Sequence, residues 1–288
     1  MAVDRRLRLA TANRNVERLA KALIFTSAFA VAVIPAFILS DLFIKGIGGL
    51  SLEFLTNPSA DAGRSGGILP ILVSTLSILA IAIGAALPLS LGSAIYLSEY
   101  AKRGGWTGRL VTGSLDILAA TPSVVFGLFG NAVFCRIMGL GYCLLAGGLT
   151  LACMILPILV RTLEITLRNV PDEYRLAGHS LGLSRIRLAT AILIPSAMPG
   201  LIAGLVLAIG RVLAETAALL FTSGYVARMP ESWFDSGRSL SIHIYDLSMV
   251  VTGGEPNAYK SAVVLLVILL LLNIGTLIIL KVWENKTR

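Results

Sequence analysis

One arginine and one glutamate lie inside a segment that is otherwise apolar enough to cross a membrane. Arg211 is near the middle of the stretch Ser196–Thr222, and Glu215 follows it four residues later. This spacing places two side chains on the same face of a helix. An arginine at the centre of a bilayer costs roughly 3 kcal/mol on insertion scales, so charged residues in such places usually serve a function.

Two interpretations of this pair are open. In the first, Glu215 and Arg211 form a structural ion pair that offsets the burial of both charges. In the second, Arg211 faces a polar pathway and binds or gates an anion, because a fixed cation lowers the cost of taking an anion out of water. The two are compatible, since Glu215 can hold Arg211 while no anion is bound. We therefore take Arg211 and Glu215 as the candidate substrate pathway.

A serine motif elsewhere has the spacing of a hydrolase centre without its context. Residues Gly178–Gly182, with Ser180 at the centre, match G-x-S-x-G. In hydrolases that motif lies on a turn from a strand to a helix, and the surrounding residues do not alternate as a strand does. The chain has two histidines, His179 inside the motif and His243. We expect His243 on the opposite side of the membrane from Ser180. The motif therefore does not predict an esterase.

Neither the cysteines nor a nucleotide motif indicates a bound cofactor. The three cysteines Cys135, Cys143 and Cys153 lack metal-ligand spacing. Cys135 and Cys143 flank a short predicted external turn, so a disulfide between them and simple apolar packing both remain open. The chain has no G-x-x-x-x-G-K-[ST] loop. We predict that it binds no cofactor itself and that ATP and Mg²⁺, if used, are bound by a partner ATPase.

The composition indicates that helices in a membrane position these residues. Hydrophobic residues make up 56% of the chain and charged residues 14%, and the mean hydropathy is +0.84. A soluble domain has about 25% charged residues. The net charge of +8 would also suit a nucleic-acid-binding protein, but the basic residues gather just outside apolar runs. We predict an all-α membrane protein.

Six apolar segments approach or exceed the roughly 20 residues that a membrane-spanning helix needs. They are Ala22–Ile44, Gly67–Leu97, Leu110–Phe134, Tyr142–Leu167, Ser196–Thr222 and Ala258–Val282. Prolines inside four of them free backbone carbonyls that neighbouring helices must satisfy, which favours a multi-helix bundle: Pro35, Pro88, Pro122 and Pro157. Gly200 and Gly204 form a small-xxx-small pair, which predicts a close helix contact.

The distribution of lysine and arginine predicts the orientation, because short cytoplasmic segments are enriched in both. With six spans, one side holds Arg5, Arg6, Arg8, Arg14, Arg18, Lys21, Lys102, Arg103, Arg109, Arg161, Arg168, Arg175, Arg185, Arg187, Lys281, Lys286 and Arg288. The other side holds only Lys45, Arg64, Arg136, Arg228, Arg238 and Lys260. Both termini are therefore predicted to be cytoplasmic. The predicted organisation is a cytoplasmic segment 1–21, a six-helix domain 22–282 with an external loop 223–257, and a cytoplasmic tail 283–288.

The cytoplasmic connection 168–195 is long and has the pattern of a short helix. Pro171 followed by Asp172 and Glu173 is typical of a helix start. Gly182 predicts the stop, and Ser184 the cap of the next segment. The apolar side of this helix predicts docking to a partner or contact with lipid, and it is formed by Tyr174, Leu176, Ala177 and Leu181.

These residues resemble the EAA-x3-G-x9-I-x-L-P loop of ABC-importer permeases, which fits into a cleft of a separate ATPase. Leu176-Ala177-Gly178 occupy the EAA positions, so a leucine replaces the glutamate and a glycine the last alanine. Gly182 fits the glycine, and Ile192 and Ile194-Pro195 fit the end of the motif. The resemblance implies a type I ABC importer permease bundle with a cytoplasmic coupling helix. It implies ATPase coupling by Glu173, Leu176, Ala177, Gly178, Gly182, Ile192 and Pro195.

Within that group the chain is similar to the PstA-type permeases of phosphate importers, from Gly66 to the C-terminus. The matching segments are Gly66-Gly67-Ile68, Pro88–Tyr100, Asp116–Gly130, Gly210–Ala217 and His243-Ile244-Tyr245. Phosphate permeases carry an arginine and a glutamate in a G-R-x-x-x-E-T segment, which Arg211 and Glu215 match. Ala214 stands where the usual glycine precedes the glutamate.

The resemblance implies a phosphate importer of the bacterial inner membrane. Its partners would be a PstC-type permease, a PstB-type ATPase dimer and a PstS-type external phosphate-binding protein. Alternatives remain open: a permease for another oxyanion or a phosphonate, or an ATP-independent anion carrier or channel. A carrier would transport alone and does not explain a docking-type cytoplasmic helix. Only the resemblance favours a heterodimer over two copies of this chain.

Overall fold

The computed structural model describes residues 2–101 and 105–287 and confirms an all-α architecture. The only strands in that part of the chain are β1 (Ser59–Ala60) and β2 (Ser65–Gly66), a short antiparallel hairpin. Four helices contain a stretch that is long and apolar enough to cross a membrane unaided. They are α1 (Ala2–Ile47), α3 (Leu69–Ile95), α6 (Leu144–Arg168) and α13 (Glu255–Thr287).

The third predicted span is not a continuous helix. It consists of α4 (Trp106–Ala120), α5 (Ser123–Gly130) and the π-helical turn η3 (Asn131–Ile137), with a bend of 105° after α4. The residue before a proline avoids the helical region, and Thr121, which precedes Pro122, is extended with ψ 129°. The predicted span Leu110–Phe134 is therefore interrupted by a bend at Pro122.

The fifth predicted span is also broken, at both of its ends. A short helical run precedes it and meets it at an angle of 70°. That run and the main helix are α8 (Arg185–Leu188), η4 (Ala189–Leu193), α9 (Ile194–Ser196) and α10 (Met198–Leu213). The helix was expected to continue to Thr222 but ends at Leu213, and the short α11 (Ala217–Leu220) follows. The count of six spans holds if each bent pair crosses the membrane once.

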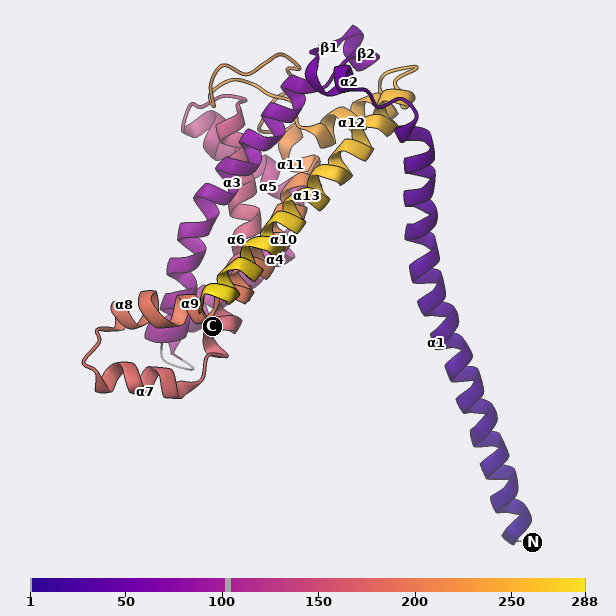
Figure 1. Ribbon diagram of the computed structural model, residues 1–288, viewed down its shortest axis with the longest axis vertical. Helices are drawn as coiled ribbons and strands as arrows, with labels where there is room; N and C mark the ends of the chain where they lie inside the picture. The colour runs from indigo at the N-terminus through magenta and orange to yellow at the C-terminus, as the bar shows by residue number, and fades with distance from the viewer. Residues whose placement is uncertain (1, 102–104, 288) are drawn as a thin grey trace.

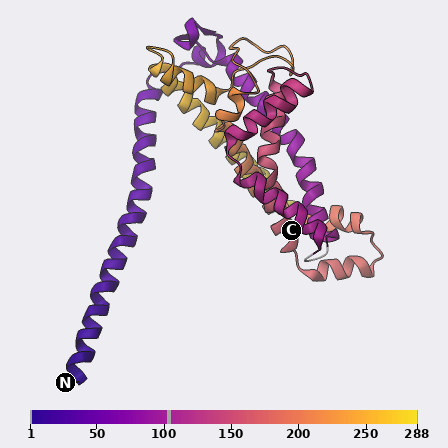
Figure 2. The same ribbon diagram turned by 180° about the vertical axis from the view of Figure 1, so that it is seen from behind.

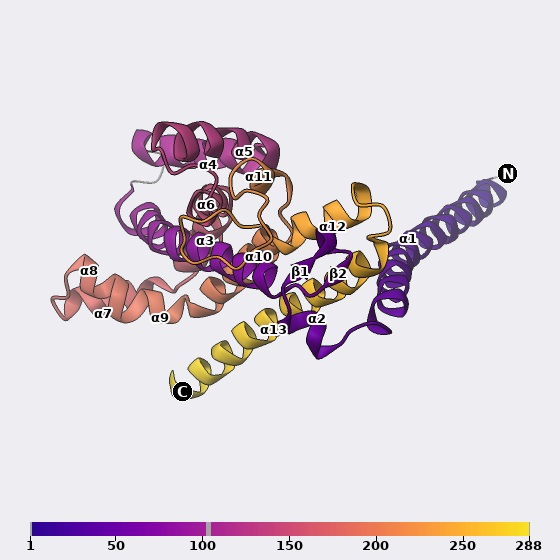
Figure 3. The ribbon, with the colours of Figure 1, turned by 90° about the horizontal axis from the view of Figure 1, so that it is seen from above.

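The core of the bundle lies where α3 and α6 pack along each other, with α10 against α6 (Figure 3). Buried apolar side chains from α3 and α6 fill this contact. Gly148 of α6 lets the two helices approach closely, because an added Cβ would lie 2.6 Å from Cβ of Ile81. The predicted close contact of Gly200 and Gly204 is confirmed, since both face threonines of α6.

Helix α1 stands away from the bundle over most of its length (Figures 1 and 2). None of its membrane-spanning window is buried, and Phe25 and Phe37 are exposed. Its C-terminal end is docked on α13: Tyr259 donates to Asp41, and an added Cβ at Gly46 would lie 2.5 Å from Val263. An apolar helix of this kind requires lipid or another protein around it.

The two ends of the molecule carry different structures (Figure 1). One end, which we call the hairpin end, holds β1, β2, the loop 223–239 and three short helices, α2 (Leu52–Thr56), η1 (Asp61–Gly63) and α12 (Leu240–Met249). The other end holds α7 (Asp172–Ser180), the start of α1 and the end of α13. Both ends of the chain thus lie on one side, as six crossings require. Lys102, Arg103 and Arg288 lie outside the described residues.

Candidate functional site

The predicted pair Arg211 and Glu215 is separated by the end of α10. Arg211 lies in the last turn and is exposed, whereas Glu215 lies beyond the helix and is 7% exposed. The N–H of Glu215 donates to the Val212 carbonyl, which tightens the turn. Within the described part of the chain no ion pair joins the two side chains. The ion pair, which was one of the two open interpretations, is absent in this structure, where the helix stops at Leu213.

The carboxylate of Glu215 instead holds the start of the next helix. Its Oε1 accepts a hydrogen bond from the N–H of Ala218 at 3.1 Å, at the beginning of α11. An acid here satisfies one of the free N–H groups at the positive end of the helix. Glu215 is therefore a capping residue in this conformation, and Arg211 is left available to other groups.

Buried hydrogen bonds of serine and threonine hydroxyl groups tie this junction to α12 and α3. Ser241 donates to the carbonyl of Glu215 at 2.6 Å, and its Oγ lies 2.9 Å from that of Ser239. The N–H of Leu240 donates to Thr75 Oγ1 of α3 at 2.9 Å. Our sequence interpretation missed these residues, because serine and threonine in apolar segments give no distinctive signal.

The second predicted feature, the segment around α7, has the local structure expected of it. The helix begins after Pro171, with Asp172 and Glu173 in its first turn. Gly182 adopts φ +70°, and the next residue donates its N–H to the Gly178 carbonyl at 3.0 Å. Ser184 then caps α8 by accepting the N–H of Arg187. The predicted start, stop and second cap are all confirmed.

The predicted coupling residues fall into an exposed and a packed group. Gly178 is buried against α8, and an added Cβ would lie 2.5 Å from Leu188 Cδ1. Ile192 and Pro195 are partly buried, and Ile192 packs on the bundle. Exposed are Glu173, Leu176, Ala177 and Gly182. With Leu176 at 67% and Leu181 at 78% exposure, α7 presents an apolar surface that this chain leaves uncovered.

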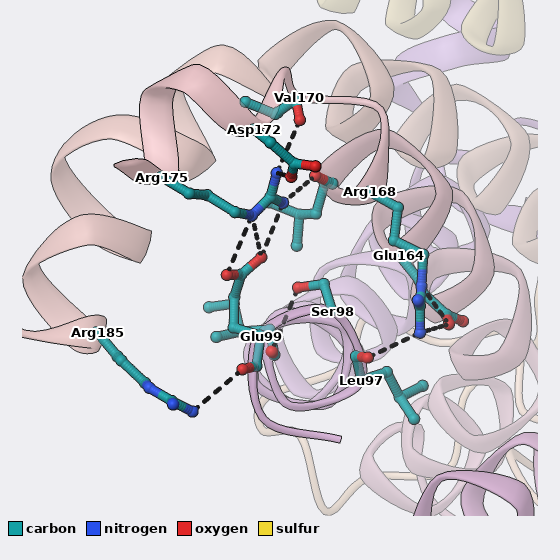
Figure 4. Close-up of polar contacts among 11 residues, drawn as sticks. Leu97, Ser98, Glu99, Glu164, Arg168, Val170, Asp172, Arg175 and Arg185 are labelled. Carbon is teal, nitrogen blue, oxygen red and sulfur yellow. Dashed lines mark hydrogen bonds and ion pairs between the residues drawn. The ribbon is translucent and has the colours of Figure 1, made fainter. Parts of the chain in front are cut away.

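Arg175 fastens α7 to the bundle (Figure 4). Its guanidinium forms an ion pair with Glu99, with Nη2 2.9 Å from Oε1 and Nε 3.3 Å from both carboxylate oxygens. It also donates to the carbonyls of Leu167 at 2.8 Å and Val170 at 2.7 Å. Hydrogen bonding to Glu99 raises the pKa of Arg175, so the arginine stays charged.

Glu99 lies in the turn η2 (Tyr96–Tyr100), which continues α3. Two other arginines also bind this turn. Arg168 donates to the Leu97 carbonyl at 2.8 Å and pairs with Glu164 at 3.1 Å. Arg185 donates to the Glu99 carbonyl at 3.4 Å. Our sequence interpretation treated Arg168, Arg175 and Arg185 only as orientation signals. The one available pointer was Glu99, which lies within a segment shared with the resembled family.

The serine motif lies in α7 and its following turn rather than between a strand and a helix. Ser180 donates to the Leu176 carbonyl at 2.9 Å, while His243 lies in α12 at the hairpin end (Figure 1). The esterase interpretation is therefore excluded by the geometry. Cys135 and Cys143 are both buried thiols in this structure, so no disulfide joins them.

The family model described as "binding-protein-dependent transport system inner membrane component" matches residues 86–288. A relative from Bacillus subtilis (strain 168), "Probable ABC transporter permease protein YqgI", is 32% identical over 294 aligned positions, covering 95% of this chain and 100% of the relative. "Phosphate transport system permease protein PstA" from Mycobacterium leprae (strain TN) is 30% identical over 275 positions, covering 93% and 90%.

The fold has a counterpart among solved structures. A chain of the inward-facing MetNI methionine ABC transporter superposes with a TM-score of 0.58 at 17% identity, covering 75% of this chain and 94% of that chain. At this low identity the structural similarity supports the fold alone. The family match and the relatives are similar in sequence as well, and they support membership of the family. The chain belongs to the binding-protein-dependent inner-membrane permeases of ABC importers and, within them, to the PstA-type permeases.

Proposed function

We propose that this chain is a translocation subunit of an ATP-driven importer of inorganic phosphate and forms half of the pathway through the membrane. The family makes it a permease and not itself a catalyst. Phosphate is supported by relatives that are named phosphate transport system permeases, among them the one from Mycobacterium leprae. The name of the B. subtilis relative gives no substrate, so a permease for another oxyanion or a phosphonate is the competing proposal.

The uncovered apolar surface of α7 carries the ATP-driven part of the proposal. Tyr174, Leu176 and Leu181 are exposed, yet the helix is fastened to the bundle by the partly buried ion pair of Arg175 with Glu99. A helix with an exposed apolar side fits a groove on a partner better than it fits water. That partner would be a PstB-type ATPase, which binds the ATP and Mg²⁺. The α7 end, with both chain ends, would then be cytoplasmic.

Helix α1 and Arg211 support a second permease, as the family implies. This chain buries none of the membrane-spanning window of α1. Arg211 is exposed although it lies in a predicted membrane-spanning segment. A PstC-type partner would cover apolar surface and enclose the arginine in a shared pathway. A PstS-type binding protein would deliver phosphate at the opposite, hairpin end.

Within that pathway Arg211 would offset the cost of removing a phosphate anion from water, which is very high for an unpaired charge. Glu215 is occupied with capping α11 in this structure, so it does not compete with an anion for Arg211. In another conformation Glu215 would be able to reach Arg211 and displace the anion, because only three residues of backbone separate them. The roles of both residues are part of the proposal.

The proposal is tested by replacing Leu176 with glutamate and measuring co-purification of the ATPase with this chain. A buried charge opposite an apolar groove is strongly unfavourable, so we expect the ATPase to be lost. Leu52→Glu is the matched control: Leu52 is exposed to 76%, but it lies at the hairpin end in α2. Equal retention of the ATPase by the two variants would refute docking at α7.

A further inference from the structure

Helix α7 is attached to the bundle mainly by polar contacts. Gly178 is its only buried residue, and most of its apolar side chains point away from this chain. Apolar packing therefore contributes little to fixing its position. Its position depends on Arg175, whose side chain is 17% exposed and reaches inward from the helix to three other segments.

The contacts of Arg175 converge on the ends of two long helices (Figure 4). Leu167, whose carbonyl accepts from Arg175, lies in the last turn of α6. Glu99, its ion-pair partner, lies in η2 at the end of the run that begins with α3. Because Nε and Nη2 both donate to Glu99, the guanidinium cannot rotate against the carboxylate without losing a bond.

The turn η2 is itself packed against the bundle. Leu97 is 1% exposed and packs with Leu115 of α4 and Val160 of α6. At the opposite end of the same run, Thr75 accepts the hydrogen bond of Leu240 in α12. Helix α3 with η2 thus extends from the α7 end to the junction next to Glu215. A displacement of η2 would be carried along this rod, since packed helices move as rigid elements.

We propose that Glu99 is a positioning residue that links movement of α7 to movement of α3. This inference depends on the proposed function, because it assumes that an ATPase moves α7. With Glu99 at 11% side-chain exposure, separating it from Arg175 would leave two mostly buried charges unpaired. The ion pair of Arg175 with Glu99 therefore stays intact when α7 moves. ATP-driven motion of α7 is transmitted through it along α3 to the substrate-facing end of the bundle.

The test measures phosphate uptake and ATP hydrolysis in proteoliposomes that hold the full complex with Glu99→Gln. Glutamine keeps the shape of the side chain and removes its charge. We expect uptake per ATP hydrolysed to fall by about tenfold or more, while hydrolysis per assembled complex is retained. A purely structural role would lower both rates together through loss of complex, and their ratio would stay at the wild-type value.

Asp172→Asn is the matched control. Asp172 also pairs with Arg175, at 3.1 Å, but its side chain is 86% exposed, so its loss should leave the ratio unchanged. Glu99→Asp, which keeps the charge, should restore part of the ratio and serves if the glutamine variant fails to assemble. A normal ratio in an assembled Glu99→Gln complex would overturn the inference. Absence of ATP-dependent uptake in the wild-type complex would instead refute the proposed function.

Discussion

The crossing of α10 over α6 should tolerate an added methyl group at Gly204 but not at Gly200. At Gly200 a new Cβ would lie 2.5 Å from both Cβ and Cγ2 of Thr166. At Gly204 the nearest atoms are Cβ and Cγ2 of Thr162, at 3.3 and 3.4 Å. The two substitutions to alanine are chemically identical and four residues apart on the same helix, so they isolate the effect of packing.

The two substitutions are expected to change the free energy of unfolding in opposite directions. Replacing glycine by alanine inside a helix gains about 1 kcal/mol from helix propensity. At Gly204 the threonine has to move by only a few tenths of an ångström, so most of that gain should remain. At Gly200 the Cβ of Thr166 is fixed by its backbone, and its hydroxyl is bonded to the Thr162 carbonyl at 2.7 Å. Overpacking of this kind costs about 1–3 kcal/mol, which outweighs the gain.

The assay is thermal unfolding of the detergent-solubilised protein, followed by tryptophan fluorescence. We expect Gly200→Ala to unfold several degrees below the wild type and Gly204→Ala at or above it. Adding Thr166→Gly to Gly200→Ala should recover stability beyond the sum of the single changes, because it removes the clashing atoms. If Gly200→Ala proved as stable as Gly204→Ala, the helices would not be packed as described.

Three further outcomes follow from the structure. Arg211→Gln should lower ATP-dependent phosphate uptake by at least about tenfold without reducing assembly, since an unpaired buried anion is costly; a normal rate would remove Arg211 from the pathway. Gly182→Asn should keep the ATPase bound, because asparagine tolerates a positive φ, whereas Gly182→Val should weaken its co-purification at a cost of about 1–2 kcal/mol; equal binding by both would contradict the role of this turn. Burial lowers the pKa of His243, in α12, to about 4. Between about pH 6.5 and pH 4, His243 is therefore protonated in the unfolded chain but neutral in the folded chain. Stability is therefore full above that pH and falls by roughly 3 kcal/mol as the pH drops to about 4; His243→Asn should flatten this dependence in thermal unfolding, and an unchanged slope would be inconsistent with it.

Local signals in the sequence predicted α7 with little error. Its start at Pro171, the positive φ of Gly182 and the cap at Ser184 depend on residues within a few positions of one another. The close contact at Gly200 was also predictable, because small residues four apart mark one helical face. Where the structure depends only on neighbouring residues, the residue types were sufficient.

The bends could not be read from the same signals. Pro122 was expected to sit inside a helix repaired by its neighbours, as Pro88 and Pro157 do, but it separates α4 from α5 by 105°. Likewise the apolar pattern continues past Leu213 although the helix does not. Whether a proline or a polar residue breaks a helix depends on the partners that receive the freed backbone groups, and these are distant in the sequence.

The contacts of the candidate site were the least predictable. Arg175 and Glu99 are 76 residues apart, and each alone looks like an ordinary charge near a membrane surface. Arg211 and Glu215 were proposed as a candidate pathway from their position and spacing, and the ion pair that this spacing left open is absent here. Side-chain partners between distant segments follow from packing of the whole bundle, which the residue types do not specify.

The central claim is tested most directly by uptake of labelled phosphate into proteoliposomes. They would hold this chain with its permease partner, ATPase and external binding protein, each omitted in turn. We predict ATP-dependent uptake that requires all four proteins. Uptake by this chain alone and without ATP would contradict the account and indicate a carrier or channel.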